Sequence, residues 1–328
     1  MSRKIYYIND LGFTDGYISN VEIERLPLAH MIHHPWYSVR WNSIEREITG
    51  ENNVIIIQTP VHDEKTKLQI ALNLSEKNHV FVSQEGNIFE WFEWDATEQE
   101  LYIRLLSKSI AFLHHSDFDK KVMSVFVDRF VKWNGCINFS TDSPKTFEDC
   151  GEYISLPTPI KRYQRGMITH KLAVDVIKDI PIYSSAYNRP SGIHMLSFPD
   201  SYKLDGISLV PRMNLDTWLS YINNSKFGID IHREFSGGNC SLEYAALGVP
   251  LIGNINLDTQ ADLFPNTSFD YLDYDGIKNA IHLLLHDKDF YEDVSKNALD
   301  VLKNQYYSSI VVEKFRSDFE KVLSEVVP

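Results

Sequence analysis

Short apolar runs alternate with longer amphipathic segments along the first half of the 328-residue chain. Runs that end in polar residues are typical of buried strands, and they cover residues 4–10, 53–60, 79–86 and 109–115. Amphipathic segments between and after them predict helices at 63–76, 97–107 and 117–130, and residues 152–160 predict a last strand that stops at its prolines. This alternation is typical of a parallel sheet covered by helices.

The same alternation starts again after residue 160. Further strands are predicted at 179–185, 206–213, 226–232, 249–254 and 268–275. Helices are predicted at 168–178, at 215–225, from about Asn239, and in three closing segments at about 275–286, 288–304 and 308–326. We therefore predict an α/β protein of two Rossmann-like domains joined near residue 160. Ligands of such sheets bind beyond the carboxyl ends of the strands, so two domains facing each other would form a cleft for a substrate.

Composition and charge narrow the class of protein. The formal net charge is -13, which on average repels nucleic acid and anionic membranes. The sequence has no apolar run long enough for a membrane span, and its first residues lack the apolar segment of a secretory signal. The cysteines are Cys136, Cys150 and Cys240, a sparse set without metal-ligand spacing. We expect reduced thiols in a cytoplasmic protein.

The stretch FSGGNCSLEYAALGVPLIG, residues 235–253, carries the clearest chemistry. Gly237 and Gly238 let the backbone approach a ligand closely, and Asn239 or Ser241 is a suitable N-cap for the helix that follows. Free N–H groups at a helix start attract phosphate. Glu243, expected in the first turn, could accept hydrogen bonds from sugar hydroxyls. Each feature taken singly is also common in helix starts that bind nothing, because a first-turn glutamate is stabilised by the helix dipole alone.

The whole run GGNCSLEYAALGVPLIG, followed by DTQ, resembles the donor-binding region of group 1 (GT4-like) glycosyltransferases with the GT-B fold. The resemblance covers about residues 209–265 well and the remaining architecture in outline. It implies two Rossmann-like domains, an acceptor domain at 1–160 completed by the C-terminal helix at about 308–326, and a donor domain at 161–307. It also implies that the C-terminal helix packs back on the N-terminal domain.

The resemblance assigns roles to individual residues. Glu243 corresponds to the ligand of the nucleotide ribose, and a polar loop at Asp258, Thr259 and Gln260 stands where several families contact the donor sugar. The cradle for phosphate and sugar is formed by Gly237, Gly238, Asn239 and Ser241. The leaving diphosphate would be neutralised by Arg189 and Arg212, so no cofactor and no metal is expected, and the nucleotide sugar is a substrate. His232 and Arg233 are further candidate donor contacts.

The candidates for a catalytic role are acidic residues. Many retaining enzymes of this fold carry two glutamates eight positions apart, whereas Glu234 and Glu243 are nine apart, so the stereochemistry stays open. An inverting enzyme needs a general base near the acceptor hydroxyl, and Asp15 and Glu85 are the candidates. Other polar residues at predicted strand ends of the acceptor domain are Asp10, Gln58, His62, Gln84, His114 and His115. The aromatic run at 87–94 is either a packed element or a platform for a sugar or base, and the histidine run at 30–36 is structural or lines the acceptor site.

Several functions are consistent with these residues. The first is a metal-independent glycosyltransferase, a hexosyl- or pentosyltransferase of the EC 2.4 class, whose acceptor is a glycan, a small molecule or a modified DNA base. The second is a nucleotide-sugar 2-epimerase on a GT-B-like fold, although those enzymes carry Thr-Glu-Arg where this chain has Leu-Asp-Thr-Gln at 257–260. The third is a binding module for carbohydrate or nucleotide without catalysis. The sequence leaves the nucleotide, the acceptor and the oligomeric state open.

Overall fold

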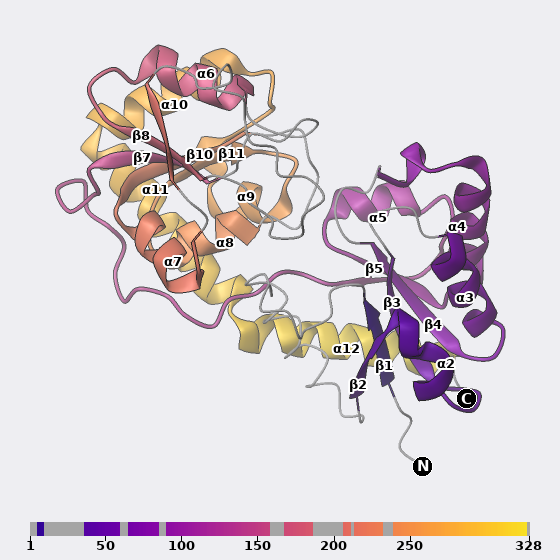
Figure 1. Cartoon of the computed structure of the whole chain (residues 1–328). Helices are drawn as coiled ribbons and strands as arrows, with labels where there is room; N and C mark the ends of the chain where they lie inside the picture. Colours follow the sequence, from indigo (N-terminus) through magenta and orange to yellow (C-terminus); the bar gives the residue numbers. More distant parts are fainter. Residues whose placement is uncertain are drawn as a thin grey trace. The chain divides into compact units, whose positions relative to one another are not determined.

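A computed structural model describes residues 5–9, 36–59, 65–84, 90–157, 167–185, 206–210, 213–231 and 239–326. Within these ranges the chain forms two compact units (Figure 1). Unit 1 contains the described residues up to Cys136 and from Ser308 onwards, and unit 2 contains those from Ile137 to Tyr307. The chain enters unit 2 after Cys136 and leaves it at Tyr307, so the C-terminal segment from Ser308 returns to unit 1.

Unit 1 is built on a six-stranded parallel sheet in the order β2-β1-β3-β4-β5-β6. The strands are β1 (Ile5–Asn9), β2 (Trp36–Arg40), β3 (Val54–Thr59), β4 (His79–Gln84), β5 (Ala111–His114) and β6 (Phe130–Lys132). The helices are α2 (Ile44–Glu47), α3 (Lys65–Ser75), α4 (Ala96–Lys108), α5 (Asp117–Met123) and α12 (Ser308–Val326).

Alternate residues of the unit 1 strands pack against helices on opposite faces of the sheet. Ile55 and Ile57 contact the core formed with α3 and α4, whereas Val54 and Ile56 belong to the core formed with α12. On that second face Phe319 of α12 is fully buried, and its ring stacks on Phe81 with the centroids 4.5 Å apart. The prediction that the C-terminal helix packs on the N-terminal domain is therefore confirmed (Figure 1).

Unit 2 has a second six-stranded parallel sheet in the order β12-β11-β10-β7-β8-β9. Its strands are β7 (Tyr153–Leu156), β8 (Ile182–Ser185), β9 (Ile207–Val210), β10 (Ser225–Asp230), β11 (Leu251–Asn254) and β12 (Ser268–Phe269). Its helices are α6 (Met167–Val176), α7 (Leu215–Asn223), α8 (Asn239–Ala246), α9 (Asp258–Leu263), α10 (Tyr274–His286) and α11 (Lys288–Val301). The cores on the two faces of this sheet are formed with α7, α8, α9 and α11 on one side and with α6 and α10 on the other.

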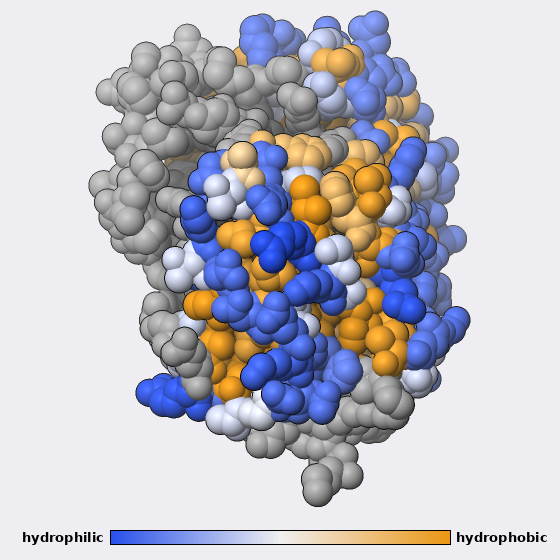
Figure 2. All heavy atoms as spheres, turned by 90° about the vertical axis from the view of Figure 1, so that its right-hand side faces the viewer, coloured by the Kyte–Doolittle hydropathy of each residue, from blue (hydrophilic) through white to orange (hydrophobic). Residues whose placement is uncertain are grey.

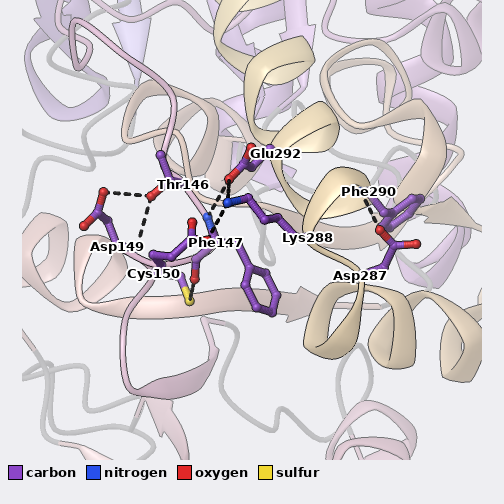
Figure 3. Close-up of polar contacts among 9 residues, drawn as sticks. Thr146, Phe147, Asp149, Cys150, Asp287, Lys288, Phe290 and Glu292 are labelled. Atoms are coloured by element: carbon purple, nitrogen blue, oxygen red, sulfur yellow. Dashed lines mark hydrogen bonds and ion pairs between the residues drawn. The ribbon is translucent and has the colours of Figure 1, made fainter.

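The segment that leads into unit 2 is held against the start of α11 (Figure 3). The Phe147 backbone N–H donates to Glu292 Oε1 at 3.3 Å, and Lys288 forms ion pairs with Glu292 and with Glu148. Asp287 caps α11 by accepting the Phe290 N–H at 3.0 Å. These contacts explain why residues 137–150 belong to unit 2, although the sequence grouped them with the first domain.

Three elements differ from the sequence-based expectation. Residues 152–160 were expected as the last strand of the first domain, but β7 lies in the second sheet between β10 and β8, because its buried Ile154 pairs with both. The helix expected over 117–130 ends at Met123, since the Arg129 carbonyl accepts from the Phe112 N–H and the chain then pairs with β5 as β6.

The strand expected over 268–275 is limited to β12. After Phe269 the chain turns, because Asp270 accepts the Leu272 N–H through its side chain at 2.9 Å and the Asp273 N–H through its carbonyl at 3.0 Å. Asp273 then caps α10 by accepting the Gly276 N–H at 3.0 Å. Three further elements, β2, β6 and α9, were not predicted from the sequence. All three are short, and β2 and β6 pair with strands that lie elsewhere in the sequence, so a local pattern carries little information about them.

The surface is that of an ordinary globular protein. Figure 2 shows hydrophobic residues scattered among hydrophilic ones over the face in view, as expected where apolar atoms contribute part of any protein surface. Among the described residues, Phe92, Val125 and Leu272 are large apolar side chains with half or more of their surface exposed. No helix in the described part of the chain combines the length and apolar character needed to cross a bilayer.

Candidate functional site

The order of strands in unit 2 defines where a ligand would bind. Numbered within the unit, the order is 3-2-1-4-5-6, the arrangement of dinucleotide-binding Rossmann folds. The strand order reverses between β7 and β10, which are paired in parallel through Ile154 and Phe227. Ligands of such sheets bind beyond the carboxyl ends of the strands at this reversal. The next element that the structure describes after β10 is α8, which carries the second part of the stretch singled out in the sequence.

Helix α8 is fixed to the sheet by a close approach. A Cβ at Gly228 of β10 would lie 2.4 Å from a ring carbon of Tyr244 on α8, so only glycine allows this packing. The Tyr244 hydroxyl lies 2.6 Å from Ser155 Oγ on β7. Burial raises the pKa of Tyr244, so the phenol stays neutral and can share a proton with that serine. The helix is thus tied to both strands at the reversal point.

Glu243 lies one turn further along α8 than expected. The helix begins at Asn239, so Glu243 is its fifth residue and not part of the first turn. The carboxylate is 8% exposed, and its Oε2 accepts a hydrogen bond from Trp218 Nε1 of α7 at 2.6 Å. A buried carboxylate needs such donors because removing it from water is costly. Trp218 could not be found from the local sequence pattern, since it lies 25 residues away in a different helix.

Asn239 and Ser241 are the other donor-site candidates within the described chain. Asn239 is the first residue of α8, and its Oδ1 is shielded from solvent without a hydrogen-bond partner among the residues described. Ser241 is buried, and its Oγ donates to Gln260 Oε1 at 2.8 Å. Gln260 in turn donates to the Leu251 carbonyl at 3.0 Å. The hydroxyl of Ser241 therefore links α8 to α9 and β11.

The polar loop expected at Asp258, Thr259 and Gln260 is the first turn of α9. Thr259 and Gln260 are buried there, because Gln260 packs over Gly253 of β11 and bonds its neighbours. Another buried acidic residue, Asp230, ends β10 with 6% exposure at the strand reversal. Asp230 falls within the strand predicted at 226–232, where the sequence pattern indicates no separate role for it.

Most other candidate residues lie outside the part of the chain that the structure describes. On the donor side these are Arg189, Arg212, His232, Arg233, Glu234, Gly237 and Gly238. On the acceptor side they are Asp10, Asp15, His62, Glu85 and the histidine run at 30–35. Their predicted roles stay predictions. In the described ranges, no group of three or more histidine, cysteine or acidic side chains is arranged to hold a metal ion.

Polar side chains at the strand ends of unit 1 are buried and hydrogen-bonded. The Tyr7 hydroxyl donates to Gln58, and the Tyr102 hydroxyl donates to Gln84 Oε1 at 3.1 Å. His114 Nδ1 lies 2.9 Å from the Ser116 carbonyl, and this oxygen only accepts, so Nδ1 carries the proton. Burial lowers the pKa of His114.

The neighbouring His115 donates in the same way through Nδ1 to the Trp133 carbonyl at 2.9 Å. In the aromatic run, Trp91 is 3% exposed and packs against Tyr102 and Phe126, which fits the reading of a packed element at this residue. Phe92 beside it is half exposed.

No protein-family model matches the sequence, and none of the curated proteins does. Solved structures do match the fold. HepE from Anabaena, in complex with UDP-glucose, has a TM-score of 0.70 at 8% identity, with 97% of this chain and 99% of that one covered. An alpha-glucosyltransferase in complex with UDP and a 13-mer DNA containing a HMU base has a TM-score of 0.64 at 11% identity, with coverage of 98% and 99%.

TarM from S. aureus, in complex with fondaparinux, alpha-GlcNAc-glycerol and UDP, has a TM-score of 0.64 at 12% identity. The match covers 85% of this chain, but the chain spans only 58% of the length of TarM. These structures are GT-B glycosyltransferases, and the likeness shows that this chain has the GT-B fold. The predicted α/β fold with two Rossmann-like domains is confirmed.

Proposed function

We propose that this protein is a glycosyltransferase that takes a sugar from a nucleotide-diphosphate sugar, with UDP as the nucleotide part, and passes it to an acceptor hydroxyl. The observation that carries the proposal is Glu243, a buried carboxylate held on the helix that follows β10 at the strand reversal of unit 2. A carboxylate is a good acceptor for the two hydroxyls of a ribose. UDP is favoured because the similar structures of HepE, TarM and the alpha-glucosyltransferase contain UDP or UDP-glucose.

In this proposal different elements of unit 2 bind different parts of the donor. The ribose hydroxyls donate to Glu243, and the diphosphate lies at the start of α8, where backbone N–H groups and the helix dipole favour negative charge. Gly237, Gly238 and Asn239 would form this cradle. As the bond from the sugar to the diphosphate breaks, negative charge grows on the leaving oxygen. The guanidinium groups of Arg189 and Arg212 would stabilise that charge in place of a metal ion.

The acceptor step follows from the same chemistry. In an inverting reaction, Asp15 or Glu85 would take the proton from the acceptor hydroxyl as it attacks the sugar. In a retaining reaction, Glu234 would lie close to the transferred sugar. The nine-residue spacing of Glu234 from Glu243 favours neither course over the other.

A modified base in DNA is the second candidate acceptor. The specific observation in its favour is the alpha-glucosyltransferase bound to DNA, whose match covers 98% of this chain. The net charge of -13 opposes non-specific binding to bulk DNA, so a DNA acceptor would need a local basic surface. Incubation with radiolabelled UDP-glucose and either a 13-mer with HMU or the same 13-mer with thymine tests this candidate. Label on the first oligonucleotide alone would support it, and label on neither would exclude this acceptor.

The donor part of the proposal is tested by thermal unfolding with UDP, GDP, ADP and dTDP. A nucleotide that binds the folded chain raises its midpoint temperature in proportion to the logarithm of its concentration. We expect UDP to raise the midpoint of the wild type, and Glu243→Ala to weaken UDP binding by about tenfold to a hundredfold, the equivalent of about 1.5–3 kcal/mol for hydrogen bonds to a charged group.

Glu292→Ala is the matched control, because it removes a helix carboxylate of the same unit that contacts Lys288 and Phe147 instead. It should bind UDP like the wild type. No midpoint shift with any of the four nucleotides would refute the proposed function. Recovery of an altered sugar together with free UDP, in the absence of any acceptor, would point to an epimerase instead.

A further inference from the structure

A strong polar contact joins helices α7 and α8. Trp218 Nε1 donates to Glu243 Oε2 at 2.6 Å. The indole N–H can only donate, and the carboxylate can only accept while ionised, so the pair is complementary. A hydrogen bond to a charged acceptor is shorter and stronger than one between neutral groups. This contact therefore restrains the side chain that the proposed function places on the ribose.

Trp218 is itself held in place from its own helix. Asn214 caps α7 by accepting the Thr217 N–H at 2.9 Å, which fixes the turn that carries the tryptophan. The Trp218 ring stacks on Tyr221, with ring centroids 5.5 Å apart and an interplanar angle of 27°. Tyr221 is 7% exposed, and its hydroxyl donates to the Tyr183 carbonyl of β8 at 2.8 Å.

The stack extends further into unit 2. The Tyr221 ring also stacks on Tyr153 of β7 at 5.6 Å, and Tyr153 meets Tyr183 edge to face at 4.9 Å. Burial raises the pKa of Tyr221, so it remains a neutral donor. A chain of aromatic contacts thus connects two strands of the sheet to the indole that holds Glu243. This packing restrains the plane of the indole and therefore the direction of its N–H.

We propose that Trp218 is a positioning residue of the donor site, which orients the Glu243 carboxylate toward the ribose hydroxyls of the nucleotide. The inference rests on the proposed function, because it assigns Trp218 a role only if Glu243 contacts ribose. An ionised carboxylate has about four lone-pair sites, so the bond from the indole is compatible with further donors from a ribose diol. Without the N–H, the carboxylate can adopt other rotamers, and ordering it again reduces affinity.

The test compares UDP with 2′-deoxy-UDP by titration calorimetry on the full chain. The ratio of their dissociation constants reports the contact between Glu243 and the ribose 2′-hydroxyl. General damage to the fold weakens both ligands equally and leaves this ratio unchanged. The variants are Trp218→Phe, which keeps a ring over Tyr221 but has no N–H, and Glu243→Ala, which removes the ribose ligand. Tyr221→Phe is the matched control, since it removes the hydroxyl that donates to the Tyr183 carbonyl but keeps the ring under Trp218 and the indole N–H.

We expect wild type and Tyr221→Phe to bind UDP at least tenfold more tightly than 2′-deoxy-UDP, as for a lost hydrogen bond to a charged group. Glu243→Ala should bring the ratio close to one, and Trp218→Phe should lower it at least threefold. A wild-type ratio in Trp218→Phe, with the ratio lost in Glu243→Ala, would overturn the positioning role alone. A wild-type ratio in Glu243→Ala, or no binding of UDP by the wild type, would overturn the proposed function and this inference with it.

Discussion

The C-terminal helix α12 offers a direct test of how unit 1 is assembled. Phe319 lies at the centre of the contact between α12 and the sheet, is fully buried, and touches the rings of Phe81 and Phe315. Replacing it with alanine removes a buried aromatic ring and leaves a cavity. Substitutions of this kind cost about 3–5 kcal/mol. In a domain of this size each kcal/mol lowers the unfolding midpoint by about 2–4 °C, so we expect a decrease of about 6–20 °C in unit 1.

Tryptophan fluorescence is a selective assay for this effect. Of the six tryptophans, Trp218 is in unit 2, and the others precede residue 136 and belong to unit 1. Thermal unfolding followed by tryptophan emission should therefore show the lowered midpoint in Phe319→Ala. UDP affinity at 25 °C should stay at the wild-type value, because the proposed donor site is in unit 2. Ile310→Ala is the matched control on the same helix, since Ile310 is 40% exposed and its truncation should change the midpoint by less than about 2 °C.

Two results would refute this reasoning. An equal, small change in Phe319→Ala and Ile310→Ala would mean that α12 does not form the core of unit 1. Phe319→Ala could also lose UDP binding at a temperature where its tryptophan emission is still that of the folded protein. This result would mean that unit 1 contributes a contact to the nucleotide.

Three further predictions follow from single contacts. Gly228→Ala should lower the free energy of unfolding by about 1–3 kcal/mol, because the added methyl group overlaps the Tyr244 ring. In a Tyr244→Ala background the same change should cost less, and urea denaturation of the wild type, both single variants and the double variant measures the difference. His114→Gln should flatten the loss of stability below about pH 6.5. Burial lowers the pKa of His114 in the folded chain, so the unfolded chain binds more protons at this residue and the free energy of unfolding decreases as the pH falls. If the urea midpoint changes by the same amount between pH 7 and pH 5 in His114→Gln and in the wild type, this explanation is wrong. Gln260→Leu should destabilise the fold by about 1–3 kcal/mol, since it leaves the buried Ser241 hydroxyl without its acceptor, and a melting curve like that of the wild type would show that this bond contributes little.

The local hydrophobic pattern was sufficient for the long, strongly periodic elements. The buried runs that form β3, β4 and β5 were predicted to within a few residues, and the bounds of α12 were predicted from its apolar spacing. These elements bury one face or both, so their pattern follows from burial alone. Where the partner decided the outcome, as for β6 and β7, the pattern was ambiguous, because a short apolar run does not show which sheet it joins.

Part of the candidate site could likewise be predicted from the sequence, and part could not. Glu243 could be selected as a candidate from the sequence because it stands in a glycine-rich run that resembles a donor-binding region, whereas the roles of Gly237 and Gly238 stay predictions. The position of Glu243 one turn into α8 could not be predicted, since a stretch with two suitable capping residues has two possible starts.

By itself the sequence determined that this is an α/β protein and that a glycine-rich segment, a helix with a glutamate and a strand follow one another after residue 226. Both conclusions depend on periodicity and residue type, which are local properties. Only the tertiary structure decided the strand order of unit 2, which brings that helix to the reversal between β7 and β10, and the bond from Trp218 to Glu243. Both depend on groups far apart in the chain, and only packing brings such groups together.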